Sequence, residues 1–107
     1  MSILVPRGFR LAGIHCGVKK VAGKEDLTLI HAPEGAVAAG VYTQNLVFAA
    51  PVAVDRQRTP SPDVRVVVAN SGNANACTGD RGLADALAMA KAAADAVGAT
   101  ESQSLVM

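Results

Sequence analysis

Apolar segments of strand length alternate with clusters of turn-forming residues over the first part of the chain. They are rich in Val, Ile, Leu and Ala, and they span about 10–19, 26–31, 36–42, 46–54 and 64–69. The three-residue gap at 43–45 is the best hairpin candidate. Pro60 and Pro62 predict a loop over 56–63, because proline cannot donate a hydrogen bond to a sheet. The sequence therefore predicts five strands before residue 70.

A helical period replaces this pattern after residue 79. Apolar residues recur at steps of four and three, at Leu83, Leu87, Ala90, Ala94 and Val97. That spacing places them on one face of a helix, and the many alanines favour a helix as well. Gly98 stands where a left-handed C-terminal cap is expected, and Thr78 or Asp80 could cap the start. We therefore expect one long helix over about 80–97.

The final residues, QSLVM, have the composition of another strand at its beginning. Strands followed by a helix indicate the α+β class. A single helix gives too little cover for so many strands. We therefore expect residues 1–107 to form a single domain or a fragment that packs within a larger layered structure.

The segment NSGNANACTG, between the last predicted strand of the first part and the helix, is the most unusual part of the chain. A small-residue loop before a helix can bind phosphate, but this segment lacks the known glycine motifs and their lysine, and Asp80 would repel an anion. Asparagine side chains can instead satisfy the backbone of a tight turn. Alternatively, Asn70, Asn73 or Asn75 faces a cleft and donates to a carbonyl or an oxyanion. These last two interpretations are compatible.

Two cysteines and two histidines offer a further possibility. Cys77, close to the predicted helix start, could act as a nucleophile with His15 or His31 as base. The favoured interpretation is a packed, inert Cys77 and structural histidines. Neither Cys16 nor Cys77 belongs to a metal-binding pattern, so we expect reduced thiols and no metal site.

Composition narrows the possible partners. Ten basic and nine acidic residues give a net charge of +1, which offers no field for nucleic acid or an anionic membrane. Apolar residues make up 50% of the chain, yet no apolar run approaches the length of a membrane span, and Pro6, Arg7 and Arg10 interrupt the N-terminus before a signal core could form. A cytoplasmic protein is therefore expected.

The order of several segments resembles a known family. The segments GFRLAGIHCGVKK, VRVVVANSGNANACTGDRG and ADALAMAKAAADAVGA are similar to the N-terminal part of the α chain in the ornithine acetyltransferase family, also called bifunctional glutamate N-acetyltransferase. The segment NSGNANACTG is the most specific of these matches. The resemblance covers nearly the whole chain.

This resemblance implies an acyltransferase of arginine biosynthesis with an αββα layered fold, an α/β sandwich. Family members move acetyl from N-acetylornithine to glutamate, and some also use acetyl-CoA as a substrate; no cofactor is implied. Their precursor cleaves itself into α and β chains, and the new N-terminal threonine forms a covalent acetyl-enzyme. The terminal amine can act as base for that threonine, which divides one exchange into two easier steps.

The family's catalytic motifs do not occur in residues 1–107. The Met-Ala-Thr cleavage junction is absent, and the oxyanion Thr-Gly pair would be expected just after a strand such as SLVM. No catalytic residue is therefore assigned, and Asn70, Asn73 and Asn75 are candidates for a substrate-pocket wall. We expect this chain to be inactive without the rest of the α chain and the β chain. The alternative is a stand-alone module that binds a small molecule on the same scaffold.

Overall fold

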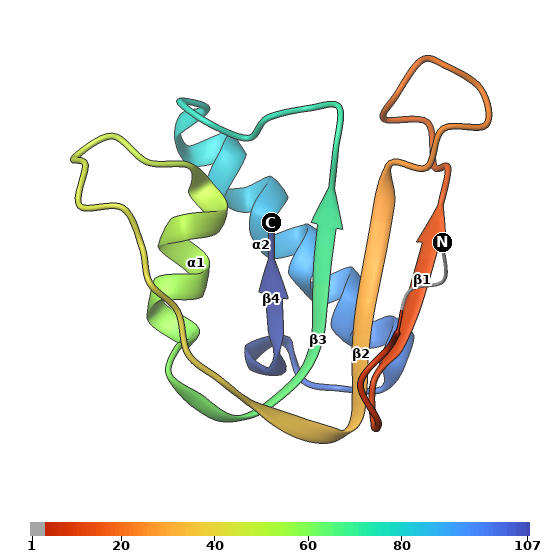
Figure 1. Ribbon diagram of the computed structural model, residues 1–107. Helices are drawn as coiled ribbons and strands as arrows, with labels where there is room; N and C mark the ends of the chain where they lie inside the picture. Colours follow the sequence, from red (N-terminus) through yellow and green to blue (C-terminus); the bar gives the residue numbers. More distant parts are fainter. Residues whose placement is uncertain (1–3) are drawn as a thin grey trace.

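Four strands lie in one mixed sheet, in the order β1-β2-β3-β4, and two helices pack on one of its faces (Figure 1). The structure is a computed structural model, and it describes residues 4–107. The strands are β1 (Arg10–Ile14), β2 (Leu27–Ala38), β3 (Ser61–Asn70) and β4 (Ser104–Val106). The helices are α1 (Ala50–Arg58), α2 (Gly79–Val97) and a short 3₁₀ turn, η1 (Glu101–Gln103).

The last pair of strands differs from the others in direction. β1, β2 and β3 are antiparallel neighbours, whereas β3 and β4 run parallel, with Val67 opposite Leu105. α2 connects the two parallel strands, as a parallel pair requires. The carboxyl ends of β3 and β4 therefore lie at the same edge of the sheet.

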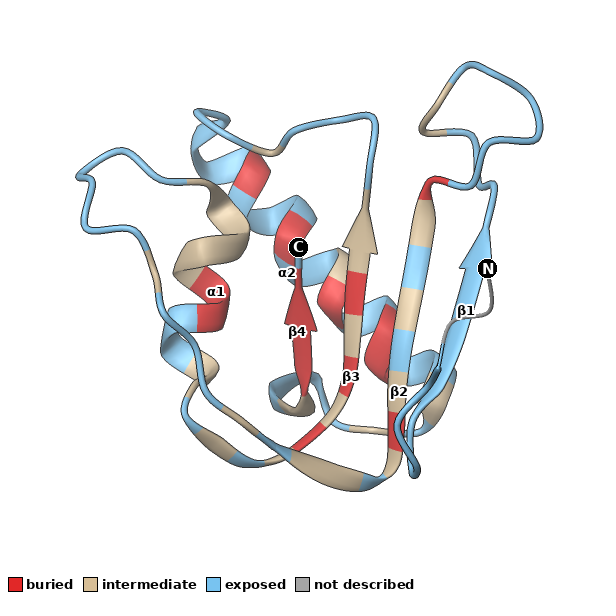
Figure 2. Ribbon diagram, in the orientation of Figure 1, coloured by how far each residue is buried: buried red, intermediate tan, exposed pale blue. Residues whose placement is uncertain are grey.

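The core lies between the sheet and α2. Alternate residues of the strands face the helices, among them Val66, Val68 and Val106, each at most 3% exposed. α2 meets them with small side chains, Ala86, Ala90 and Ala93, and α1 adds Val54. Figure 2 shows this buried stripe along α2 and the fully buried β4. Because alanine has almost no side chain, α2 lies close to the sheet.

The opposite face of the sheet carries apolar residues that no described helix covers. Leu11, Ile30 and Val67 stand side by side in register across β1, β2 and β3, and the buried Leu105 of β4 continues this row. Leu11 is 47% exposed and Ile30 is 38% exposed. β1 is exposed along its whole length (Figure 2). This face has the character of a surface that packs against another layer.

Several sequence predictions are confirmed. The α+β class is correct, and the expected helix over 80–97 is α2, which ends at Val97 and is capped by Gly98 with a left-handed φ of 71°. The strand expected at 64–69 is the central part of β3, and QSLVM contains β4. Thr78 is the N-cap residue of α2, although its side chain makes no capping hydrogen bond.

The prediction for 46–54 was wrong. This segment is not a strand and forms no hairpin at 43–45; it enters α1 at Ala50. Pro51 stands in the first turn of the helix, where its missing N–H costs nothing, and Arg56 and Arg58 lie in the last turn. A short apolar run has no periodicity of its own, so Pro51 was the better signal.

Three strand boundaries were also wrong. The segments expected at 26–31 and 36–42 belong to one strand, β2, which runs only from Leu27 to Ala38, because a bulge between His31 and Ala36 absorbs the expected turn. Arg65 stabilises that bulge by donating from Nη1 to the Pro33 carbonyl at 2.6 Å. The first strand ends at Ile14 rather than residue 19, and β3 begins at Ser61, within the expected loop.

No helix of the described residues combines the length and the apolar character that crossing a membrane requires.

The alanine face of α2 generates a stability prediction. Ala90 is 0% exposed against the sheet, so Ala90→Leu should overpack the core and lower the free energy of unfolding by about 2 kcal/mol. Ala92 is exposed on the same helix, and Ala92→Leu should change it by less than about 0.5 kcal/mol. Urea unfolding measures both. Equal effects of the two substitutions would contradict the packing described.

Candidate functional site

The asparagine loop, residues 70–79, spans the edge where β3 and β4 end. Two adjoining hollows lie beneath it, with volumes of about 310 and 410 Å³. Both are lined by Pro51, Asn70, Asn73, Ala74, Asn75 and Val106. In open α/β sheets, ligands bind outside the carboxyl ends of the strands. The hollows therefore lie at the edge of the sheet where ligands bind in such folds.

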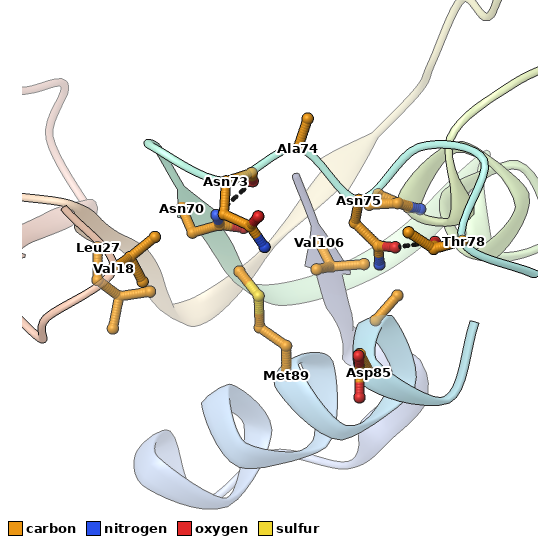
Figure 3. A pocket seen from close by; sticks show the side chains of 12 residues that line it. Val18, Leu27, Asn70, Asn73, Ala74, Asn75, Thr78, Asp85, Met89 and Val106 are labelled. Atoms are coloured by element: carbon orange, nitrogen blue, oxygen red, sulfur yellow. Dashed lines mark hydrogen bonds between the residues drawn. The ribbon is translucent and has the colours of Figure 1, made fainter. Parts of the chain in front are cut away.

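All three candidate asparagines line these hollows. Figure 3 shows their side chains on the side of the loop that faces Met89 and Val106. The first hollow combines these amides with aliphatic side chains of Val18, Leu27 and Met89 and with the Asp85 carboxylate at its α2 side. A mostly apolar hollow with a few directed polar groups can hold and orient a small molecule.

Two of the asparagines also stabilise the loop itself. Asn70 donates from Nδ2 to the Asn73 carbonyl at 3.0 Å, and Asn75 donates from Nδ2 to the Gly82 carbonyl at 2.7 Å. The Asn75 carbonyl accepts the N–H of Ala50 at 3.2 Å and so satisfies the start of α1. The structural interpretation of the loop is therefore correct for Asn70 and Asn75.

Asn73 differs from the other two. No hydrogen bond of its side-chain amide to residues 4–107 is found, although its carbonyl accepts from Asn70. The amide of Asn73 therefore has donors and an acceptor available on the cavity side.

Gly82 lets α2 approach the loop closely. It is buried in the first turn of the helix, and a Cβ there would overlap Thr78 Oγ1 and Asn75 Oδ1. Thr78 donates from Oγ1 to Asn75 Oδ1 instead of capping the helix. Residue 82 thus has to be glycine for Asn75 to reach its carbonyl.

Asp26 is a structural residue beside the candidate site that the sequence analysis missed. Its side chain is 0% exposed and accepts backbone N–H groups of Cys16, Gly17 and Lys19 at 2.7, 3.2 and 2.9 Å. The Asp26 carbonyl accepts the N–H of Ser71 at 2.9 Å. This one residue therefore ties the 15–25 loop to the asparagine loop.

The surroundings of Asp26 favour its ionised form. The Cys16 N–H is the main cause that holds the pKa of this carboxyl far below its usual range, against the effect of burial. The Lys19 N–H and the nearby His15, whose Nδ1 lies 3.2 Å from Oδ2, act in the same direction. In the sequence, Asp26 is only the first residue of a predicted strand, and no local pattern signals this role.

The cysteine hypothesis gains no support. The expectation of a packed Cys77 was wrong, because Cys77 is exposed, with a φ of 57° that keeps it in the loop. His31 lies mid-sheet opposite Val66, four residues of strand or about 13 Å from the loop edge. His15 donates from Nδ1 to the Lys24 carbonyl at 2.7 Å.

The chemical state of the two thiols also gives no support to a cysteine nucleophile. Cys16 and Cys77 form no disulfide with each other, and interaction with the Asp26 carboxylate raises the pKa of the Cys16 thiol. A raised pKa keeps the thiol protonated and a poor nucleophile. Over residues 4–107, no group of three His, Cys, Asp or Glu side chains could hold a metal ion.

Comparison with known proteins identifies the family. The model of the ArgJ family matches residues 10–107. The chain belongs to the ArgJ family. The family resemblance found in the sequence is thereby confirmed.

Curated ArgJ relatives extend well beyond this chain. The arginine biosynthesis bifunctional protein ArgJ of Symbiobacterium thermophilum is 50% identical over 98 residues, which are 91% of this chain and 24% of that protein. The protein of the same name from Geobacter sulfurreducens is 49% identical over 100 residues, 94% of this chain and 25% of that protein. The chain thus spans about a quarter of the length of these relatives.

Two solved structures share the fold. The arginine biosynthesis bifunctional protein ArgJ of Bacillus halodurans superposes with a TM-score of 0.86 at 39% identity, covering 94% of this chain and 52% of that one. The ornithine acetyltransferase of Mycobacterium tuberculosis, solved in complex with ornithine, gives a TM-score of 0.86 at 41% identity, covering 94% and 55%. The layered α+β fold described above is therefore an ArgJ fold.

The bonds of Asn75 generate one prediction for this ArgJ-family chain. Asn75→Asp places a carboxylate against the Gly82 carbonyl in place of a donor, so it should lower the free energy of unfolding by about 1–2 kcal/mol. Asn73→Asp should change it by less than about 0.5 kcal/mol. Urea unfolding of both variants measures this. An Asn75→Asp variant as stable as Asn73→Asp would show that the loop does not depend on this bond.

Asp26 generates a pH prediction. Because its pKa is lower in the folded state than the usual value of about 3.9, its stabilising effect is complete above that value and is lost as the pH falls below it. Asp26→Asn should therefore be less stable than wild type at neutral pH and should lose less further stability on acidification to about pH 3. Urea midpoints across this range measure both curves. Parallel curves would show that the ionised Asp26 is not the cause of the loss of stability at low pH.

Proposed function

We propose that this chain is the N-terminal part of an ornithine acetyltransferase, and that the hollows beneath the asparagine loop form one wall of its acetyl-transfer cleft. The enzyme moves acetyl from N-acetylornithine to glutamate in arginine biosynthesis. One observation carries the proposal: three asparagine side chains line hollows at the joint carboxyl ends of β3 and β4. The related fold of an ornithine acetyltransferase that binds ornithine supports it.

The chemistry of the hollow suits a substrate wall. An acetamide presents a carbonyl acceptor and an N–H donor, and a side-chain amide such as that of Asn73 complements both. Aliphatic contacts from Leu27, Met89 and Val106 suit the methylene groups of an amino-acid chain. The wall would hold and orient the substrate, which is the part of catalysis that a scaffold can supply.

The reacting groups lie elsewhere in this proposal. A threonine at the N-terminus of the β chain attacks the acetyl carbonyl, its terminal amine accepts the hydroxyl proton and passes it to the amide nitrogen, and ornithine leaves as the free amine. Glutamate then takes the acetyl group from the threonine ester, and the hydroxyl is restored. The described residues contribute no nucleophile to these steps. Acetyl-CoA would enter only as an alternative acetyl donor.

The uncovered sheet face supports a place within a larger protein. Leu11 and Ile30 belong to an apolar row across the sheet that the helices leave open. In an αββα fold a second sheet packs on this face, and the remainder of the α chain and the β chain would supply it. The alternative, a stand-alone binding module, would leave this apolar face in water.

The test compares two preparations. The complete protein that includes this chain should exchange acetyl between N-acetylornithine and labelled glutamate, and residues 1–107 alone should not. In the complete protein, Asn73→Ala should lower kcat/KM about three- to tenfold through the loss of one neutral hydrogen bond. Asn45→Ala, on an exposed loop away from the hollows, is the matched control and should change nothing.

Three results would overturn the proposal. Acetyl exchange by residues 1–107 alone would show that the chain carries its own catalytic group. A folded complete protein without exchange would contradict the activity, and equal kinetics for Asn73→Ala and Asn45→Ala would remove Asn73 from the cleft wall.

A further inference from the structure

Side chains of α1 hold the outer edge of β4, where no strand of the described residues pairs. On its inner edge, the Met107 N–H donates to the Val68 carbonyl at 2.8 Å, and the Met107 carbonyl accepts the Asn70 N–H at 3.1 Å. Successive residues of a strand direct their backbone groups to opposite edges. The backbone groups of Ser104 and Val106 therefore face away from β3.

Two residues of α1 supply the missing partners. Asp55 accepts the Val106 N–H on Oδ1 at 3.0 Å, and Arg58 donates from Nη1 to the Ser104 carbonyl at 2.8 Å. Asp55 is 6% exposed, and the Arg58 side chain is 13% exposed and also pairs with Glu101. An acceptor and a donor three residues apart on a helix face thus replace the hydrogen bonds of a neighbouring strand.

Asp55 also borders the candidate site. Together with Val106 and Met107 it lines the second hollow, beside the asparagine loop. Met107 directly follows Val106, the last residue of β4, and its carbonyl accepts the N–H of Asn70. A displacement of β4 would therefore change the position of the backbone at Met107 relative to Asn70 and Asn73.

We propose that Asp55 is a positioning residue of the acetyl-transfer cleft, whose carboxylate holds the edge of β4 and so fixes the backbone at Met107 against the asparagine loop. The inference rests on the function proposed above. Burial raises the pKa of the Asp55 carboxyl, and the Val106 N–H and Arg58 act against this effect. A neutral side chain with the same acceptor oxygen is therefore expected to serve in its place.

The test uses four variants of the complete protein. Asp55→Ala removes the acceptor and should lower kcat roughly ten- to a hundredfold, because a small misplacement of a reacting geometry is costly, while KM changes less. Asp55→Asn keeps the acceptor and should stay within about threefold of wild type. Asp55→Glu keeps the charge but displaces the edge, so its kcat should fall. Asp95→Ala, an exposed carboxylate on α2, is the control.

Amide hydrogen exchange provides the second readout, independent of activity. The amides of Val106 and Met107 should exchange at least about tenfold faster in Asp55→Ala and Asp55→Glu, and at the wild-type rate in Asp55→Asn. If Asp55→Ala does not fold, the kcat values and amide exchange rates of Asp55→Asn and Asp55→Glu decide whether Asp55 is a positioning residue.

The outcomes separate the two proposals. A wild-type kcat in Asp55→Glu and Asp55→Ala would overturn the positioning role, whatever the exchange rates. Loss of activity in Asp55→Asn together with unchanged exchange at Val106 would overturn it as well. A folded wild-type protein that does not transfer acetyl would overturn the proposed function. The amide hydrogen-exchange rates of Val106 and Met107 would then still decide whether Asp55 holds β4.

Discussion

The parallel pairing of β3 with β4 is the constraint on which the rest of this structure depends. It brings two carboxyl ends to one edge of the sheet and requires α2 as the connection between them. Alanines on α2 then allow the helix to lie close to both strands. The asparagine loop has to span the short distance from the end of β3 to the start of α2, and the hollows lie beneath it.

Two buried carboxylates secure the segments on either side of this loop. Asp26 binds the 15–25 loop through three backbone N–H groups and contacts Ser71 through its own carbonyl. Asp55 binds the free edge of β4 through Val106. Their pKa values shift in opposite directions, since backbone donors lower the pKa of Asp26 and burial raises that of Asp55. In both cases an acidic side chain replaces the backbone partner that a regular element would provide.

The features that could be predicted from the sequence have a strong local signal. α2 has a long helical period and a glycine cap, and the small polar residues of 70–79 marked the asparagine loop as the candidate site. α1 was mistaken for a strand because nine residues around Pro51 are too short to show a period. β2 was divided in two because a bulge at Gly35 resembles a turn. The backbone N–H groups that Asp26 and Asp55 bind lie seven to fifty-one residues away, and no local pattern reveals them.

The central claim is that the asparagine loop forms a wall of the acetyl-transfer cleft. The most direct measurement is a crystal structure of the complete protein with ornithine bound. The account predicts the Asn73 amide nitrogen about 3 Å from the ligand or from a water that bridges to it. All three asparagine amides bonded within their own loop, with ornithine on the order of 10 Å away beyond the reach of one bridging water, would contradict it.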